Sequence, residues 1–158
     1  MHSIQQHLSV VAVSVIEYFK KTGQYNAIYV AGHSQGSLVG LLAAKDRADG
    51  FISLAGAGQS IDHVIMEQVT KTAPMFTEDA KRVFAILKEG KTTTDYPQAL
   101  GSIFSKDVQP FISNWMSYDP KEEIKKLEMP ILIINGTKDL QVSESEAKLL
   151  HDAVPKST

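Results

Sequence analysis

The clearest chemical signal in the chain is a short motif built around one serine: Gly32-His33-Ser34-Gln35-Gly36. A short apolar run precedes the motif, and an apolar segment of helical length follows it. A serine between two such elements can sit on a strained strand-to-helix turn that exposes its hydroxyl as a nucleophile. The flanking glycines would let the strand and the helix pass closely, and the N–H of Gln35 would face a developing oxyanion. The plainer alternative is a Gly/Ser turn that only joins a strand to a helix.

A second candidate is Asp139, which follows an apolar run at 130–135 and a turn at 136–138. The run contains four successive branched aliphatic residues and therefore predicts a parallel strand that is buried on both faces. Open α/β sheets gather their functional groups at the carboxyl ends of such strands. A carboxylate at this place, after the serine in the chain, can orient the base of a Ser–His–Asp set. The alternative is a turn residue whose carboxylate accepts hydrogen bonds from its own backbone.

Both stretches resemble the α/β-hydrolase superfamily, and in particular its bacterial esterase-like and serine-aminopeptidase-like members. Residues 32–36 are similar to the family's nucleophile elbow, and residues 129–139 resemble the strand and turn that carry its acid. The resemblance implies a serine hydrolase that cleaves a small-molecule ester or similar acyl bond through an acyl-serine intermediate. It implies these roles in the present chain: nucleophile Ser34, acid Asp139, oxyanion-hole donor Gln35, and elbow glycines Gly32 and Gly36.

The catalytic base has no obvious counterpart in the chain. In the resembling family the histidine follows one more strand after the acid, and several strands precede the helix that leads to the elbow. We therefore expect a partial chain that lacks the N-terminal strands and the C-terminal histidine strand, with weak or no activity by itself. We interpret His33 as a packing residue and His151 as a solvated surface residue, whereas His63 could approach the site.

The expected fold class is α/β, a partial α/β-hydrolase fold with a short parallel sheet of about three strands, flanked by helices. We expect one domain over residues 1–158, with strands at 28–31, 51–55 and 130–135 and a helical insertion at 60–128. Other predicted helices lie at 3–20 (largely buried), at 35–45, and from a Ser143–Glu146 capping box to about 153.

The insertion is predicted to contain helices at 61–70, 78–88 and 106–116. It also holds most of the aromatic residues of the chain: Phe76, Phe84, Tyr96, Phe104, Phe111, Trp115 and Tyr118. These aromatics are interpreted as core residues of small helices. The alternative is an apolar wall that accepts an acyl or aryl group of the substrate.

Composition narrows the classes of partner. The chain has 158 residues, a formal net charge of −2, no cysteine and no long run of like charge. We therefore expect no nucleic-acid partner and no membrane association, and a cytoplasmic location because residues 1–20 lack signal-peptide features. No metal or other cofactor is expected, since the histidines form no metal-binding motif.

The outer strands of a three-stranded sheet would be unpaired edges, which predicts a homo-oligomer that associates through an edge strand or an exposed apolar face. An alternative to the enzyme is a non-catalytic hydrolase fragment that self-associates through these edges. A further alternative is a flavodoxin-like or other doubly wound binding domain in which the serine motif is a coincidence.

Overall fold

The structure is a computed structural model that describes residues 4–156, with side chains from Leu8 onward. The described chain divides into two compact units. Residues 60–118 form the helical unit, and residues up to 59 together with those from 119 onward form the sheet unit.

The sheet unit contains three parallel strands in the order β1-β2-β3: β1 (Tyr29–His33), β2 (Gly50–Leu54) and β3 (Ile131–Ile134). Ala31 pairs with Ile52, and Ile52 pairs with Leu132, so the middle strand joins the two outer ones. The expected parallel sheet is confirmed, although β1 begins and ends later than predicted. Within residues 4–156 the outer edges of β1 and β3 carry no further strand.

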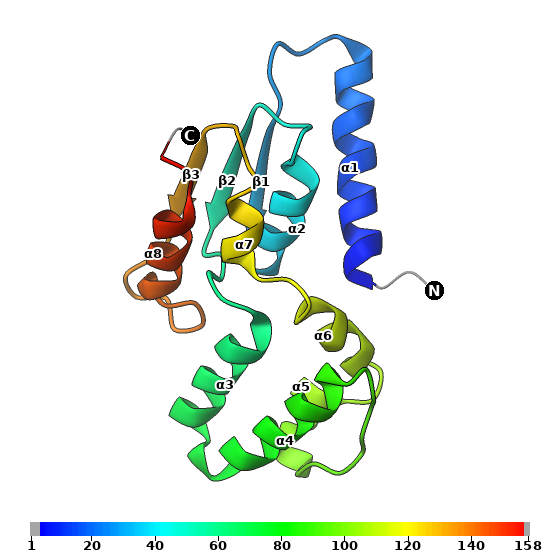
Figure 1. Ribbon diagram of the computed structural model, residues 1–158, viewed down its shortest axis with the longest axis vertical. Coiled ribbons are helices and arrows are strands. Elements are labelled where there is room, and N and C mark those ends of the chain that lie inside the picture. The colour runs from blue at the N-terminus through cyan, green and yellow to red at the C-terminus, as the bar shows by residue number, and fades with distance from the viewer. Residues whose placement is uncertain (1–3, 157–158) are drawn as a thin grey trace. The chain divides into compact units, whose positions relative to one another are not determined.

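Helices cover one face of this sheet. The sheet unit contains α1 (Ile4–Thr22), α2 (Gln35–Ala44), α7 (Pro120–Ile124) and α8 (Glu144–Ala153). Figure 1 shows α2 and α7 over the same face of the strands, with α1 running beside α2. The side chains buried between these helices and the strands form one apolar core: Leu41, Ala44, Phe51, Ile124, Leu127, Met129 and Leu150.

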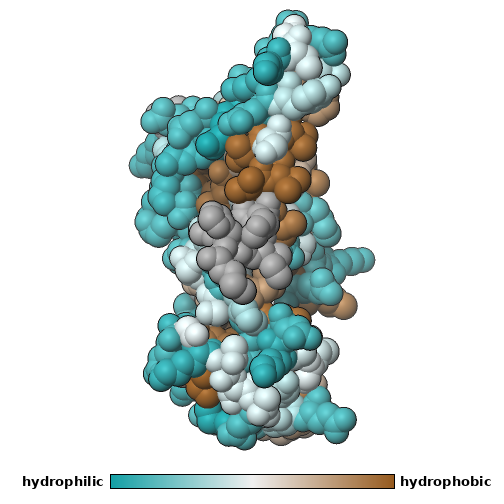
Figure 2. All heavy atoms as spheres, turned by 90° about the vertical axis from the view of Figure 1, so that its right-hand side faces the viewer, coloured by the Kyte–Doolittle hydropathy of each residue, from teal (hydrophilic) through white to brown (hydrophobic). Residues whose placement is uncertain are grey.

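Helix α1 is present where the sequence predicts it, but the prediction that it is largely buried is wrong. Ile16 is buried, whereas Val11 and Val15 are 62% and 50% exposed. The helix packs mainly against α2, so only one side of it is covered. Figure 2 shows hydrophobic side chains gathered on the outer surface over α1. Gly23 ends the helix in the left-handed conformation (φ 63°), as its C-cap role predicts.

The prediction that β3 is buried on both faces is also wrong. Ile131 and Ile133 pack into the core, whereas Leu132 and Ile134 are 52% and 48% exposed. Alternate residues of a strand point to opposite faces, and the described helices of the sheet unit cover one face only. The second face is exposed over most of its length and is called the open sheet face below. Register places these residues on it: Tyr29, Ala31, His33, Ile52, Leu54, Leu132 and Ile134.

The helical unit has a closed core of its own. Its elements are α3 (Ile61–Thr72), the 3-10 turn η1 (Pro74–Phe76), α4 (Thr77–Lys88), the 3-10 turn η2 (Gln98–Leu100), α5 (Gly101–Phe104) and α6 (Gln109–Trp115). Phe84 and Phe104 are buried edge to face, with ring centroids 5.0 Å apart. The core interpretation therefore holds for these two aromatics, while Tyr96 and Phe111 are half-buried against the same core.

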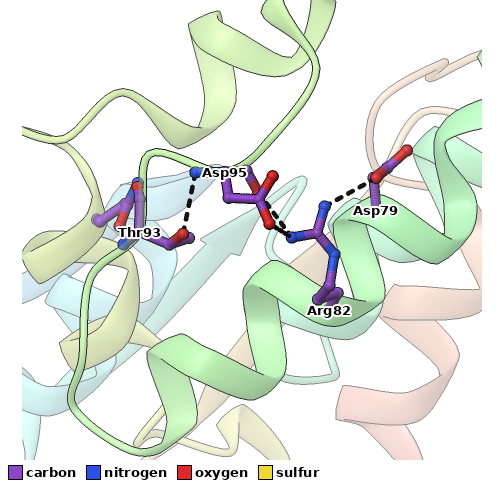
Figure 3. Close-up of polar contacts among 5 residues, drawn as sticks. Asp79, Arg82, Thr93 and Asp95 are labelled. Atoms are coloured by element: carbon purple, nitrogen blue, oxygen red, sulfur yellow. Dashed lines mark hydrogen bonds and ion pairs between the residues drawn. The ribbon is translucent and has the colours of Figure 1, made fainter.

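Polar contacts hold the long loop between α4 and η2 against this core. The buried side-chain amide of Gln109 accepts a hydrogen bond from the Thr93 N–H (2.9 Å) and donates to the Thr93 carbonyl (2.7 Å). Arg82 bonds Asp79 on its own helix (3.0 Å) and also pairs with Asp95 in the loop (Figure 3). The loop is thus pinned by a buried amide and by an exposed ion-pair network.

Candidate active site

Ser34 lies at the junction of β1 and α2 in a strained conformation. Its φ of 52° and ψ of −120° fall outside the regions that non-glycine residues usually adopt. Its N–H donates to the Leu54 carbonyl of the neighbouring strand (2.9 Å), and its carbonyl accepts from the Ser37 N–H (2.9 Å). The half-buried side chain makes no capping hydrogen bond to the helix. The backbone is therefore fixed by its neighbours, while the hydroxyl is not tied to the start of α2.

The two glycines of the motif differ in what they allow. A Cβ atom at Gly32 would overlap the carbonyl oxygen of Gly36 and lie 2.7 Å from the Ser37 Cα. A Cβ atom at Gly36 would meet nothing within 4 Å. The predicted close approach of strand and helix thus requires glycine at 32. Residue 36 contacts residue 32 through its backbone carbonyl, so this contact does not require glycine at position 36.

The carboxyl end of β2 is hydrogen-bonded to both neighbouring segments, Ser34 after β1 and Ile134 at the end of β3. The N–H of Ala55, a residue with φ 47°, donates to the Ile134 carbonyl of β3 (2.8 Å). Left-handed, non-glycine residues thus end both β1 and β2, and such strain gathers at functional sites.

Behind the elbow is a buried pair of hydroxyls that the sequence analysis did not single out. The Oγ atoms of Ser37 and Ser53 lie 2.8 Å apart. A Cβ atom at Gly56 would overlap both oxygens. These small residues allow α2, β2 and the loop after β2 to approach closely.

Asp139 lies beyond the carboxyl end of β3, on the same edge of the sheet as Ser34. Its Oδ1 accepts hydrogen bonds from the N–H groups of Gln141 (2.8 Å) and Val142 (3.0 Å). The Val142 bond and the Gln141 bond, with a smaller effect of the His33 charge, hold the pKa of Asp139 below its usual value. Oδ2 receives no hydrogen bond from the described residues. The carboxylate is therefore ionised at neutral pH, held by its own turn, and has one oxygen available.

Three histidine side chains, His33, His63 and His151, are described, each within its own unit. His33 is exposed on the open sheet face, so its interpretation as a packing residue is wrong. His151 is exposed on α8 and lies 3.2 Å from Asp152, as expected of a surface residue. His63 belongs to the helical unit, where its Nδ1 lies 3.4 Å from the Ser60 Oγ. Among the side chains described from Leu8 onward, no histidine is hydrogen-bonded to the Ser34 hydroxyl.

Glu146 has a different role from the predicted one. The capping box is absent, because the Ser143 hydroxyl pairs with Ser145 and makes no cap to α8. The buried Glu146 carboxylate instead accepts hydrogen bonds from the N–H groups of Gly58 (2.7 Å) and Gln59 (3.1 Å), and from the Gln59 side chain (2.8 Å). It therefore anchors the loop that leaves β2 beside the elbow, a long-range contact without a local sequence signal.

Asp62 is a buried carboxylate in the helical unit that the sequence analysis also missed. Its side chain lies 2.6 Å from the Lys88 ammonium and 2.6 Å from the Ser60 hydroxyl. Burial raises the pKa of a carboxyl group. Here the hydrogen bonds from Lys88 and Ser60 outweigh burial, and the net effect lowers the pKa of Asp62.

Neither a metal centre nor a membrane span is found in the described residues. No group of three or more His, Cys, Asp or Glu side chains among them is arranged to hold a metal ion. No helix in the same part of the chain is both long enough and apolar enough to cross a bilayer.

No family model matches the chain. The chain is 24% identical over 142 residues to Esterase EstD of Thermotoga maritima, and the alignment covers 87% of the chain and 33% of the esterase. A solved structure of a monoacylglycerol lipase from Paleococcus ferrophilus superposes with a TM-score of 0.53 and 16% identity, over 97% of the chain and 62% of the lipase. A lipase-esterase related protein from Clostridium acetobutylicum gives a TM-score of 0.54 and 17% identity, over 96% and 63%.

These likenesses show the α/β-hydrolase fold. The partial α/β-hydrolase fold that the sequence predicts is therefore confirmed. The chain contains a part of the fold, since it spans about a third of EstD and less than two thirds of each of the two solved structures.

Proposed function

We propose that the chain carries the nucleophile and the acid of a hydrolase that cleaves a small-molecule ester or similar acyl bond. The observation that carries the proposal is the conformation of Ser34, a non-glycine residue held at φ 52° between β1 and α2 by a contact that requires Gly32. The likeness to an esterase and to a lipase supports the hydrolytic class of reaction.

In the proposed reaction the Ser34 Oγ attacks the acyl carbon while a histidine base takes its proton. The N–H of Gln35 stabilises the oxyanion of the tetrahedral intermediate, aided by the positive end of the α2 dipole. The intermediate collapses, the base returns the proton to the leaving group, and water then releases the acid from the acyl-serine. The Asp139 Oδ2 accepts the other N–H of the imidazole and holds it in the reactive tautomer.

The geometry of the sheet supports this assignment of the acid. Ser34 follows β1 and Asp139 follows β3, so two strand spacings of about 4.8 Å separate the two strand ends. An imidazole between them could hydrogen-bond to both side chains. Because no described histidine is bonded to Ser34, we propose that the chain by itself is a weak enzyme; loss of the base typically lowers the rate by about 10⁴-fold or more.

The test is labelling with a serine-directed fluorophosphonate, read by intact mass. We expect slow labelling of the unaltered protein that approaches one label per chain on long incubation, none in Ser34→Ala, and unchanged labelling in Ser102→Ala, which removes an exposed serine of the helical unit. Labelling that survives Ser34→Ala would remove the assignment of the nucleophile. A protein that circular dichroism shows to be folded, and that still takes no label, would favour the non-catalytic alternative.

A further inference from the structure

Asn135 is the first residue after β3, and its side chain reaches across the turn that carries Asp139. Its side-chain nitrogen Nδ2 donates to the Val142 carbonyl (3.0 Å) and to the Gly136 carbonyl (3.3 Å). The opposite orientation of the amide would set its oxygen against these two carbonyl oxygens, so Nδ2 is the atom that faces them. One side chain therefore joins the two ends of the turn.

The two residues that Asn135 joins are also residues that hold Asp139. The Gly136 carbonyl accepts a hydrogen bond from the Asp139 N–H (3.1 Å), and the Val142 N–H donates to the Asp139 Oδ1 (3.0 Å). The second donor to Oδ1, the Gln141 N–H, lies two residues from Asp139 and belongs to the turn itself. The Val142 contact needs the turn to be closed. Without the Asn135 side chain, the Val142 N–H would be free to move away from Oδ1.

Asn135 makes these contacts at a cost to its own side chain. Its carbonyl oxygen Oδ1 is buried and accepts no hydrogen bond from the described residues. A buried polar atom without a partner destabilises a fold. A leucine, which has a similar branched shape, would remove that oxygen, although it would also take the Nδ2 donor from the Val142 carbonyl. Stability alone therefore gives little reason for asparagine at position 135, whereas the contacts around Asp139 do.

We propose that Asn135 is a positioning residue of the candidate active site, one that closes the acid turn and keeps the Asp139 carboxylate in place with Oδ2 available. Its role in catalysis rests on the proposed function, in which Oδ2 orients the histidine base. A carboxylate that is already fixed needs no reordering during the reaction. The contacts that carry the inference lie within residues 135–142, so they do not depend on what covers the exposed apolar surfaces of the sheet unit.

The test is the titration of Asp139 in Asn135→Leu, followed through the carbon-13 shift of its carboxyl carbon and assigned by the absence of that signal in Asp139→Asn. In the unaltered chain the pKa of Asp139 should lie below its usual 3.8, because the hydrogen bond from Val142 favours the ionised form most strongly. In Asn135→Leu we expect this pKa to rise toward 3.8. The charge of His33 also lowers it, and His33 is unchanged in every variant. Thr137→Ala is the matched control, because Thr137 is exposed in the same turn and the pKa should stay low.

Hydrogen exchange at neutral pH gives a second measurement, which does not require the chain to stay folded in acid. The Val142 N–H should exchange about 5–10-fold faster in Asn135→Leu than in the unaltered chain or in Thr137→Ala, the effect of one lost hydrogen bond. An unchanged pKa of Asp139 in a folded variant, or an unchanged exchange rate at Val142, would overturn the proposal. A lower melting temperature with both readouts unchanged would do the same, since that result means a purely structural role.

Neither measurement depends on the reactivity of Ser34. A chain that takes no fluorophosphonate label would remove the proposed hydrolase function, whereas the link between Asn135 and the Asp139 carboxylate would still be decided by the titration and by hydrogen exchange.

Discussion

The helical unit and the sheet unit use their apolar residues in different ways. The helical unit buries its large apolar side chains in a core of its own, which includes Val83, Phe84, Leu87 and Phe104. Among the described residues, Met75 is the only large apolar side chain of this unit that is strongly exposed; the others belong to the sheet unit. The sheet unit has more apolar surface than its own helices and strands can cover.

The difference shows where each unit obtains its stability. Both units contain a longer amphipathic helix, α1 in the sheet unit and α4 in the helical unit. The helices of the helical unit surround a common centre, so their stripes meet one another. In the sheet unit the helices lie on one face, and a sheet exposes its second face unless another layer covers it. The helical unit is therefore expected to be stable by itself, whereas the described part of the sheet unit leaves apolar surface exposed.

The largest effect is expected from a matched pair of truncations, one in each unit. Phe104→Ala removes a fully buried ring from the helical core and should lower the free energy of unfolding by about 3–5 kcal/mol. Leu132→Ala shortens a side chain that is 52% exposed on the open sheet face and should lower it by less than about 1 kcal/mol in the monomer. Urea unfolding followed by the fluorescence of the single tryptophan, Trp115, and by circular dichroism measures both.

Equal losses in the two variants would contradict this comparison. The control for self-association is protein concentration, because the two losses should not change with it if the chain is monomeric.

The next effect separates the two glycines of the elbow. Gly32→Ala sets a Cβ against backbone atoms of Gly36 and should destabilise the sheet unit by about 3 kcal/mol, with loss of fluorophosphonate labelling at Ser34. Gly36→Ala adds a Cβ that meets nothing within 4 Å and should leave both stability and labelling close to those of the unaltered chain. Thermal unfolding and intact mass give the two readouts. A larger loss in Gly36→Ala than in Gly32→Ala would refute the packing described for the elbow.

The smallest effect concerns the pH dependence of the helical unit. The pKa of Asp62 is lower in the folded chain than its usual value of 3.8. Its contribution to stability is therefore fully present above the unfolded pKa, near pH 4, and is lost as the pH falls through the lower folded pKa. Asp62→Asn should cost about 1–3 kcal/mol at pH 7, since Lys88 stays partly hydrated, and should cost much less at pH 2–3.

Urea unfolding at the two pH values, read by Trp115 fluorescence, tests this expectation. Asp107→Asn is a suitable control, because Asp107 is exposed in the same unit and should change stability little at either pH. A loss for Asp62→Asn that is the same at both pH values would show that the ion pair with Lys88 is not the source of the effect.

The strands and the longer helices could be predicted because their signals are local. Residues 29–33, 50–54 and 131–134 form strands close to the predicted ranges, and the elbow lies between a strand and a helix as its motif indicates. The short helices α5 and α7 were missed, since five residues or fewer show no period. A capping signal for α7 was nevertheless present: Asp119 accepts a hydrogen bond from the Lys121 N–H (3.0 Å), and Pro120 follows it.

The residues of the candidate site could be predicted from the sequence, but the long-range hydrogen bonds that hold the neighbouring loop could not. Ser34 and Asp139 lie at strand ends on one edge of the sheet, which follows from motif and chain order; their catalytic roles stay predictions. Glu146 illustrates the opposite case. Its local sequence favours a capping box with Ser143, but the carboxylate bonds the backbone of Gly58 and Gln59, far away in the chain. The N–H groups of Gly58 and Gln59 donate to this carboxylate, and only folding brings them within hydrogen-bonding distance of it.

The sequence by itself determined the order of elements, the parallel sheet and the strained turn at Ser34, because periodicity, glycine spacing and turn residues act over a few neighbours. Only the tertiary structure decided which apolar surfaces are covered. The apolar patterns of α1 and β3 are those of buried elements, yet Val11 and Leu132 are exposed. An apolar pattern shows that a residue can be buried, but burial requires a second surface, and whether that surface exists depends on how the whole chain, or a second copy of it, is arranged.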